Sequence, residues 1–244
     1  KFNFRASYAA GFRTPTLSEL YATDIAKKND RLTIGNLDLK PEKNNYFSLS
    51  AEYVHERFSV SVNAFYNNIR DMIDYNTIAT GDKAMEQYGH KEVRQRDNIA
   101  EAKVYGINVS ANAYLGAGFN LSGGYTHLNT QDVELEQPID KSIKNAYNIN
   151  AQWAHSWKIY RLNINLNGRI NSKRFSKSYC YAPEYQLWDL NTRHSFNLKS
   201  VIIEPGCGME NLFDYMDDRP YNSNYATLTP GRSFYISLSL KFKS

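Results

Sequence analysis

The acidic side chains are the residues of this chain that could carry catalysis, but their spacing does not build a catalytic site. Asp71 and Asp74 are three residues apart, which would place them on opposite sides of a β-strand, and Asp217 and Asp218 are neighbours in a predicted loop. Neither pair is accompanied by a nucleophile and base, and the sequence has no GxSxG, HExxH or phosphate-cradling glycine motif. Loop carboxylates could bind Ca²⁺ or Mg²⁺, although such loops are usually just solvated. We therefore predict no enzyme activity, no catalytic residues, no metal site and no cofactor.

The cysteines and histidines also lack the spacing of a metal site. Cys180 and Cys207 form no CxxC or Cys/His motif, which leaves open only a disulfide in an oxidising compartment. Of the scattered histidines, His90 lies in a predicted outer loop and His194 in a predicted strand. The three that we expect at a membrane interface, rather than as ligands, are His55, His127 and His155.

The elements that must position these side chains are β-strands, because apolar and polar residues alternate along most of the chain. Phe58, Val60 and Val62, for example, alternate with Ser59 and Ser61. Successive side chains of a strand point to opposite faces, so this period indicates a sheet between two different environments. The ten predicted strands span residues 1–12, 44–55, 57–78, 99–115, 118–130, 144–157, 159–172, 184–198, 200–213 and 232–243.

The strand lengths and the connections between strands favour a membrane barrel over a soluble sandwich. Soluble strands average about 5 to 6 residues, whereas tilted membrane-spanning strands need about 9 to 11. The long predicted connections are 13–43, 79–98, 131–143, 173–183 and 214–231, and they alternate with turns at Glu56, 116–117, Lys158 and Lys199. Short turns on one rim and long loops on the other are typical of transmembrane barrels. The predicted fold class is therefore an all-β, antiparallel transmembrane barrel.

The composition agrees with this fold. The 244 residues include 19 Tyr and 12 Phe, the mean hydropathy is -0.60, and no run of eighteen apolar residues would form a membrane helix. Predicted members of an aromatic girdle are Tyr53, Trp153, Trp157, Tyr160 and Trp188. The opposite face, rich in Asn, Ser and Arg, suits a hydrated lumen. Pro205 removes a ladder donor, so we expect a bulge or kink there. A net charge of +4 without a dense basic block argues against nucleic acid.

The candidate ligand-binding residues lie in or beside the predicted long loops, where aromatic faces occur with fixed positive charges. This combination suits anionic or aromatic metal chelates through stacking, hydrogen bonds and attraction to cations. The alternative is that these side chains pack loop on loop or contact lipopolysaccharide phosphates. The candidates are Tyr21, Arg31, Tyr88, His90, Arg94, Arg96, Tyr179, Tyr181, Tyr185, Tyr215, Arg219, Tyr221 and Tyr225.

Several motifs resemble those of TonB-dependent outer-membrane receptors. Residues 11–21, GFRTPTLSELY, and 35–42, GNLDLKPE, are similar to the paired boxes of that family, usually written FRAP and NPNL. Further similarities are AFYNNIRDMI at 64–73, AKVYGI at 102–107, ENLFD at 210–214 and PGRSF at 230–234. Thr14 replaces the Ala of the first box, and Leu37 replaces the first Pro of the second. For Arg13, Pro15 and Asn36 we expect a structural role.

The resemblance implies a 22-stranded barrel in the outer membrane of a Gram-negative bacterium, filled by an N-terminal plug. Such a receptor binds a scarce nutrient at its outer loops and imports it when the TonB complex acts on the plug. Ten strands are about half of that barrel, so residues 1–244 are expected to be its C-terminal part, with the plug and N-terminal strands absent. Implied partners are the TonB complex, outer-membrane lipid and, in some receptors, a surface lipoprotein.

The ligand that the resemblance implies is an iron chelate, either a siderophore or haem, or cobalamin. Haem receptors of the family carry a histidine between the two boxes, and residues 14–36 contain none. Haem is therefore less favoured as the ligand than a siderophore, although it is not excluded. Two other functions stay open from the residues alone. They are a complete ten-stranded outer-membrane hydrolase, which would need a catalytic cluster on the outer rim, and a passive porin-like channel, which the Asn- and Arg-rich lumen would suit.

Overall fold

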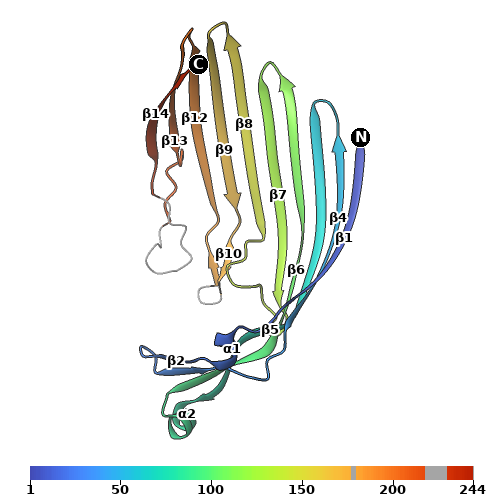
Figure 1. The fold of residues 1–244 in the computed structure, drawn as a ribbon, viewed down its shortest axis with the longest axis vertical. Coiled ribbons are helices and arrows are strands. Elements are labelled where there is room, and N and C mark those ends of the chain that lie inside the picture. The colour runs from blue at the N-terminus through green and yellow to red at the C-terminus, as the bar shows by residue number, and fades with distance from the viewer. Residues whose placement is uncertain (177–179, 218–229, 244) are drawn as a thin grey trace.

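The protein forms one curved antiparallel sheet, seen in a computed structural model that describes residues 1–176, 180–217 and 230–243 (Figure 1). The main strand order in the sheet is β1-β4-β5-β6-β7-β8-β9-β12-β13-β14, so neighbours in the chain pair in space. The bounds of these ten strands are β1 Phe2–Arg13, β4 Glu42–Val54, β5 Phe58–Thr80, β6 Glu92–Gly116, β7 Phe119–Asp132, β8 Asn145–Trp157, β9 Tyr160–Asn171, β12 Tyr185–Asn197, β13 Val201–Glu210 and β14 Ser233–Phe242. The ten predicted barrel strands are confirmed. The sheet is part of a barrel, with β1 and β14 at its two open edges.

The alternation of short and long connections is confirmed as well. Residues 55–57, 117–118, 158–159 and 198–200 form tight turns at one end of the sheet, and the long segments lie at the other end (Figure 1). Two of the turns place a non-glycine residue in the left-handed region, Ala117 with φ 50° and Lys158 with φ 44°. Such backbone closes a two-residue hairpin with the twist that the flanking strands need.

The long segments are more ordered than the sequence predicted. The segment predicted as a loop over 13–43 contains helix α1 (Leu17–Tyr21) and a hairpin of β2 (Thr23–Ala26) and β3 (Arg31–Ile34). The segment predicted as a loop over 79–98 contains helix α2 (Gly81–Tyr88) and the first seven residues of β6, and 173–183 contains the β10 (Arg174–Ser176) and β11 (Cys180–Ala182) pair. Those three loop predictions were therefore wrong in part. In the first two segments, β5 and β6 run on beyond their neighbours and hold short elements at their outer ends. In the third, β10 and β11 form a separate two-stranded sheet.

Each strand presents an apolar face and a polar face of the sheet, as the alternation predicted. On the apolar face the register aligns Phe4 with Ala51, and Leu49 with Ala64. These side chains are unusually exposed for apolar residues: Phe4 is 76% exposed and Ile236 is 88% exposed. A continuous apolar surface of this kind is suited to lipid, and the polar face to a hydrated lumen.

Aromatic rings gather near the ends of the strands, as expected of a girdle. Trp153 and Trp157 both contact the His155 ring, at centroid distances of 6.0 and 4.4 Å. His55 stacks on Phe58 at 5.1 Å. The described helices include none that is long and apolar enough to cross a membrane.

Of the bulge or kink expected at Pro205, the register excludes a bulge with an inserted residue but shows a local loss of pairing. The β13–β14 register continues through the Pro205–Leu238 pair, whereas the β12–β13 register lacks the two pairs between Arg193–Gly206 and Phe196–Ile203. The sum of the paired residue numbers is the same on both sides of that gap, so no residue is inserted. Pro205 removes pairing locally on the β12 side and leaves the register intact. Cys207, on the same strand, is a free cysteine.

Candidate functional site

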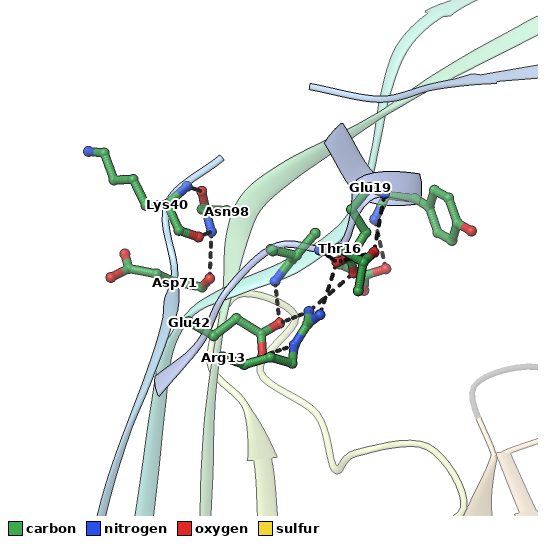
Figure 2. Close-up of polar contacts among 10 residues, drawn as sticks. Arg13, Thr16, Glu19, Lys40, Glu42, Asp71 and Asn98 are labelled. Carbon is green, nitrogen blue, oxygen red and sulfur yellow. Dashed lines mark hydrogen bonds and ion pairs between the residues drawn. The ribbon is translucent and has the colours of Figure 1, made fainter. Parts of the chain in front are cut away.

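An ion cluster lies where β1 and β4 emerge at the end of the sheet that carries the long segments (Figure 2). Arg13, the last residue of β1, donates from Nε and Nη2 to the two carboxylate oxygens of Glu42, at 2.7 and 2.6 Å. The same guanidinium donates from Nη1 and Nη2 to the carboxylate of Glu19, at 2.9 and 3.2 Å. One planar guanidinium therefore holds two carboxylates, each in a two-pronged geometry that lysine could not reproduce.

Glu19 also closes the start of helix α1. Its carboxylate accepts hydrogen bonds from the backbone N–H and hydroxyl of Thr16, at 2.8 and 2.9 Å, while the Thr16 hydroxyl accepts from the Glu19 N–H at 3.3 Å. This reciprocal capping box fixes the direction in which the chain leaves the strand. The hydrogen bond from Arg13, followed by those from Thr16, lowers the pKa of Glu19 from 4.5 to about 2.

Asn98 on β6 holds the other end of the same segment. Its Nδ2 donates to the backbone carbonyls of Lys40 and Asp71, at 2.9 and 2.6 Å, and its Oδ1 accepts from the Lys40 N–H at 2.7 Å (Figure 2). Asp71 has φ 57° and sits at a register shift between β5 and β6. This bulge breaks the strict alternation from which we placed Asp71 and Asp74 on opposite faces. Segment 14–41 is thus tied down near both of its ends.

The middle of this segment is fastened to the outer end of β6. Strand β3 pairs in parallel with β6, Leu32 lying opposite Val93, and Val93 is fully buried. The Asp30 carboxylate contacts Nδ1 of His90 at 2.9 Å, and the Lys91 N–H donates to the Asp30 carbonyl at 3.0 Å. The hydrogen bond with His90 lowers the pKa of Asp30. Residues 14–41, the outer ends of β5 and β6, and segment 81–91 between them therefore form one packed outer unit.

Six of the predicted ligand-binding residues lie on this outer unit, and three of them are occupied by contacts within it. His90 contacts Asp30, Arg94 Nε contacts the Glu92 carboxylate at 2.5 Å, and Arg96 lies 3.6 Å above the ring of Tyr75. These contacts agree with loop packing, the alternative that the sequence left open. The other three are Tyr21, which is exposed, Tyr88, which is half-buried, and Arg31, whose buried Nε has no partner among the described residues.

A second group of predicted residues gathers beyond β9 and β12. The rings of Tyr185 and Tyr215 are 6.0 Å apart, and both line a groove of about 470 Å³ together with residues of β8 and β9. Asn211 fixes the chain there, because its Oδ1 accepts from the Tyr215 N–H at 2.8 Å. Tyr181 is half exposed and meets Phe175 edge-on at 5.6 Å. The groove is lined by Asn145, Tyr147, Ile170, Asn171, Ser172, Glu184, Tyr185, Gln186 and Tyr215.

The structure therefore places nine of the candidates in two groups, and four lie outside the part of the chain that it describes. These four are Tyr179, Arg219, Tyr221 and Tyr225. Within the described ranges, no group of three or more His, Cys, Asp or Glu side chains has the arrangement of a metal site.

The residues that build the outer unit include several that the sequence reasoning missed. Glu19 was within reach, because Thr16-x-x-Glu19 is the sequence signature of a capping box. Glu42 and Asn98 gave no such signal, since their partners are 29 and 58 residues away in the chain. The structural role expected for Arg13 and Asn36 is observed: Arg13 makes the ion cluster, and Asn36 Oδ1 accepts from the Asp38 N–H at 2.9 Å.

A curved sheet with one lipid-suited apolar face, one polar face and a structured outer rim is the architecture of an outer-membrane β-barrel protein. A family model described as "TonB dependent receptor-like, beta-barrel" matches residues 1–212, and the chain belongs to this family. The family resemblance expected from the paired boxes is thereby confirmed, and the protein is an outer-membrane protein of a Gram-negative bacterium.

Solved structures of such receptors share the fold. The chain resembles the ferric enterobactin receptor PfeA from Pseudomonas aeruginosa with 20% identity and a TM-score of 0.73, covering 99% of this chain and 38% of that one. It resembles the siderophore receptor PirA from Acinetobacter baumannii with 17% identity and a TM-score of 0.74, covering 99% and 39%. For the copper transporter OprC the values are 13% identity, a TM-score of 0.72, and 99% and 38% coverage. The chain thus spans less than two fifths of these proteins' length.

Proposed function

We propose that the complete protein is a TonB-dependent transporter that carries a scarce nutrient across the outer membrane. The observation that carries the proposal is the family match over residues 1–212, on a chain whose sheet has one apolar and one polar face. Two edge strands without neighbours would leave backbone groups unpaired in lipid, which is costly. We therefore also propose that residues 1–244 are the C-terminal part of a larger, plugged barrel.

The proposed cargo is an iron chelate, with a siderophore favoured over haem and cobalamin as a further candidate. Solved structures with this fold include receptors for ferric enterobactin and ferric preacinetobactin. The exposed or half-exposed Tyr21, Tyr181 and Tyr185 offer aromatic faces for a chelate, and Arg31 offers a positive charge. A hydrolase and a passive channel are both disfavoured by the family match, since the family consists of TonB-dependent receptors.

Deleting the gene is expected to abolish growth on one specific chelate and to leave growth on the others unchanged. The strain would be starved of iron and supplied in turn with a catecholate siderophore, a mixed-ligand siderophore or haem, with cobalamin tested in an auxotroph. Reintroducing the intact gene should restore growth, and a strain lacking TonB should behave like the deletion. Uptake that persists without TonB would indicate a passive channel, and unchanged growth on every source would refute the proposed import.

The groove that Tyr185 and Tyr215 line is expected to bind part of the chelate. Replacing Tyr185 and Tyr215 together by alanine removes the paired rings of this groove. Because one aromatic contact contributes about 0.5 to 1.5 kcal/mol, we expect the half-saturating concentration of the chelate to rise about tenfold. Whole-cell binding of the radiolabelled chelate measures this change. Tyr114, a half-exposed tyrosine beside the tight turns at the opposite end of the sheet, provides the matched control. Equal binding by the double variant and the Tyr114→Ala control would remove the groove from the ligand site.

A further inference from the structure

Three cations lie together on the apolar face of the sheet, at the end that carries the long segments. Lys43 on β4 is directly opposite Arg70 on β5, and one step further in, Asn68 is opposite Lys103 on β6. Residue parity places all three on the face that carries Phe47, Tyr66 and Tyr105 rather than on the polar face. Lys43 and Arg70 are well exposed, at 66% and 61%, and Lys103 is one-third exposed.

On the apolar face, the residue types between the middle of the sheet and these cations follow the same order on adjacent strands. Starting from the middle of the apolar face, each strand passes from aliphatic to aromatic residues and ends in a cation, with an amide in between on two of them. Along β4 the order is Leu49, Phe47, Asn45 and Lys43; along β5 it is Ala64, Tyr66, Asn68 and Arg70; along β6 it is Ile107, Tyr105 and Lys103. Hydrocarbon, interface and charged headgroups follow one another in this order in a membrane leaflet, and aromatic rings mark the interface. The cations therefore lie at headgroup depth.

The ion pairs within the cluster are long. Lys43 Nζ is 3.6 Å from Asp71, and Arg70 Nε and Lys103 Nζ are 3.9 and 3.8 Å from the same oxygen of Glu101. All three distances are too long for hydrogen bonds. Three cations face two carboxylates, which leaves one positive charge in excess. Because Lys43 and Arg70 are like charges directly across two strands, an anion held between them would relieve their repulsion.

The cluster is confined to these three strands. The register aligns Lys43 with Phe12 on β1, and Lys103 with Gln131 on β7, so the neighbouring strands carry no cation at this level. A general basic rim would continue around the sheet, whereas a patch three strands wide has the dimensions of one headgroup. At about 4.8 Å between strands, the three cations span about 10 Å.

We propose that Lys43, Arg70 and Lys103 bind the phosphate of a phosphorylated glycolipid, lipopolysaccharide, in the outer leaflet of the outer membrane. The long segments of barrels in this membrane face the cell exterior, so the patch meets the outer leaflet. Each lysine and arginine N–H donates a charge-assisted hydrogen bond to phosphate oxygens. The site is on the opposite face of the sheet from the lumen and does not depend on which nutrient is imported.

The test uses the full-length receptor, purified in an uncharged detergent and stripped of lipid. Lipopolysaccharide, enzymatically dephosphorylated lipopolysaccharide and inorganic phosphate would each be titrated against the wild type and the double variant Lys43→Gln/Arg70→Gln. Lys158→Gln/Lys199→Gln, at two tight turns on the opposite rim, provides the matched loss of two charges. Lys43→Arg/Arg70→Lys keeps both charges. Heat-dependent mobility on a gel would show that each variant forms the closed barrel.

We expect phosphorylated lipopolysaccharide to bind Lys43→Gln/Arg70→Gln about tenfold more weakly than the wild type, the Lys158→Gln/Lys199→Gln control or the charge-preserving variant. Dephosphorylated lipopolysaccharide should bind all four proteins with the same low affinity. Equal affinities for the phosphorylated lipid in wild type and Lys43→Gln/Arg70→Gln would overturn the proposal. It would also be overturned if inorganic phosphate alone bound as tightly as the lipid and displaced it, because the patch would then be a site for a free anion.

Discussion

Replacing Arg13 by methionine is expected to raise amide hydrogen exchange across residues 14–41 about thirtyfold, while exchange in the barrel strands stays unchanged. The substitution removes the guanidinium that joins β1, α1 and β4 and leaves two carboxylates side by side. The carboxylates of Glu19 and Glu42 are only 13% and 15% exposed. Removing one partner of a fully buried pair costs about 3 to 5 kcal/mol. Since Arg13 is 44% exposed, solvent screening reduces this cost to about 2 kcal/mol, which corresponds to thirtyfold.

Exchange would be measured by mass spectrometry on the full-length receptor near neutral pH. At that pH the Glu19 carboxylate is ionised, because its pKa is about 2 in the folded protein. The stability that its lowered pKa contributes is fully present above the unfolded pKa of 4.5 and is lost as the pH falls through about 2. Arg13→Lys should have an intermediate effect, since an ammonium cannot hold both carboxylates in two-pronged geometry. Adding Glu42→Gln to Arg13→Met should restore part of the protection by removing the repulsion. Unchanged exchange in Arg13→Met would show that the cluster does not hold the segment.

The sheet was predictable from sequence because each strand separates two different environments. A lipid-facing and a water-facing side impose alternation on every residue, as in Phe58, Val60 and Val62 against Ser59 and Ser61, and the signal needs no knowledge of distant partners. The tight turns were predictable for a related reason: the alternation simply stops at Lys158 and resumes two residues later. The positions of the barrel strands and of the tight turns can therefore be read from the local sequence.

The outer unit was less predictable because long-range contacts determine it. The outer ends of β5 and β6 lie beyond the two-sided environment and are broken by register shifts near Met72 and Thr77, so their alternation is lost. Strand β3 exists because it pairs in parallel with β6 about 60 residues away, and four residues of Arg31–Ile34 give no pattern of their own. Asn98 is one polar residue among many in the sequence. Only the fold shows that it binds Lys40 and Asp71 together.

The same physics explains why the ligand candidates divide as they do. Choosing Tyr and Arg in predicted loops identifies side chains able to bind a chelate, but not those already engaged by neighbours. Arg96 stacks on Tyr75 from the facing strand, a partner that sequence spacing does not reveal. Tyr185 and Tyr215 come together because β12 and the segment after β13 meet at the rim. Availability for a ligand is therefore a property of the fold rather than of residue type.

Replacing Gly35 by alanine is expected to detach helix α1 from the β3 end of the segment, although the change adds a single methyl group. A Cβ at this position would lie 2.5 Å from the Leu20 carbonyl oxygen and 2.8 Å from the Tyr21 nitrogen. These are backbone atoms, so no side-chain rotation relieves the clash. Separation would also break the bonds from the N–H groups of Gly35 to Ala22 and of Asn36 to Glu19, now 2.8 and 3.0 Å long.

The loss of two hydrogen bonds at about 1 kcal/mol each, with the steric strain in addition, predicts at least thirtyfold faster exchange in residues 17–36. Gly11→Ala in β1 is the matched control, because a Cβ there meets nothing within 4 Å. If segment 14–41 forms part of the chelate site, Gly35→Ala should also lower chelate affinity, whereas Gly11→Ala should not. Protection equal to wild type in Gly35→Ala would mean that α1 and β3 do not need their close contact. The paired boxes would then be held by the Arg13 cluster and Asn98 alone.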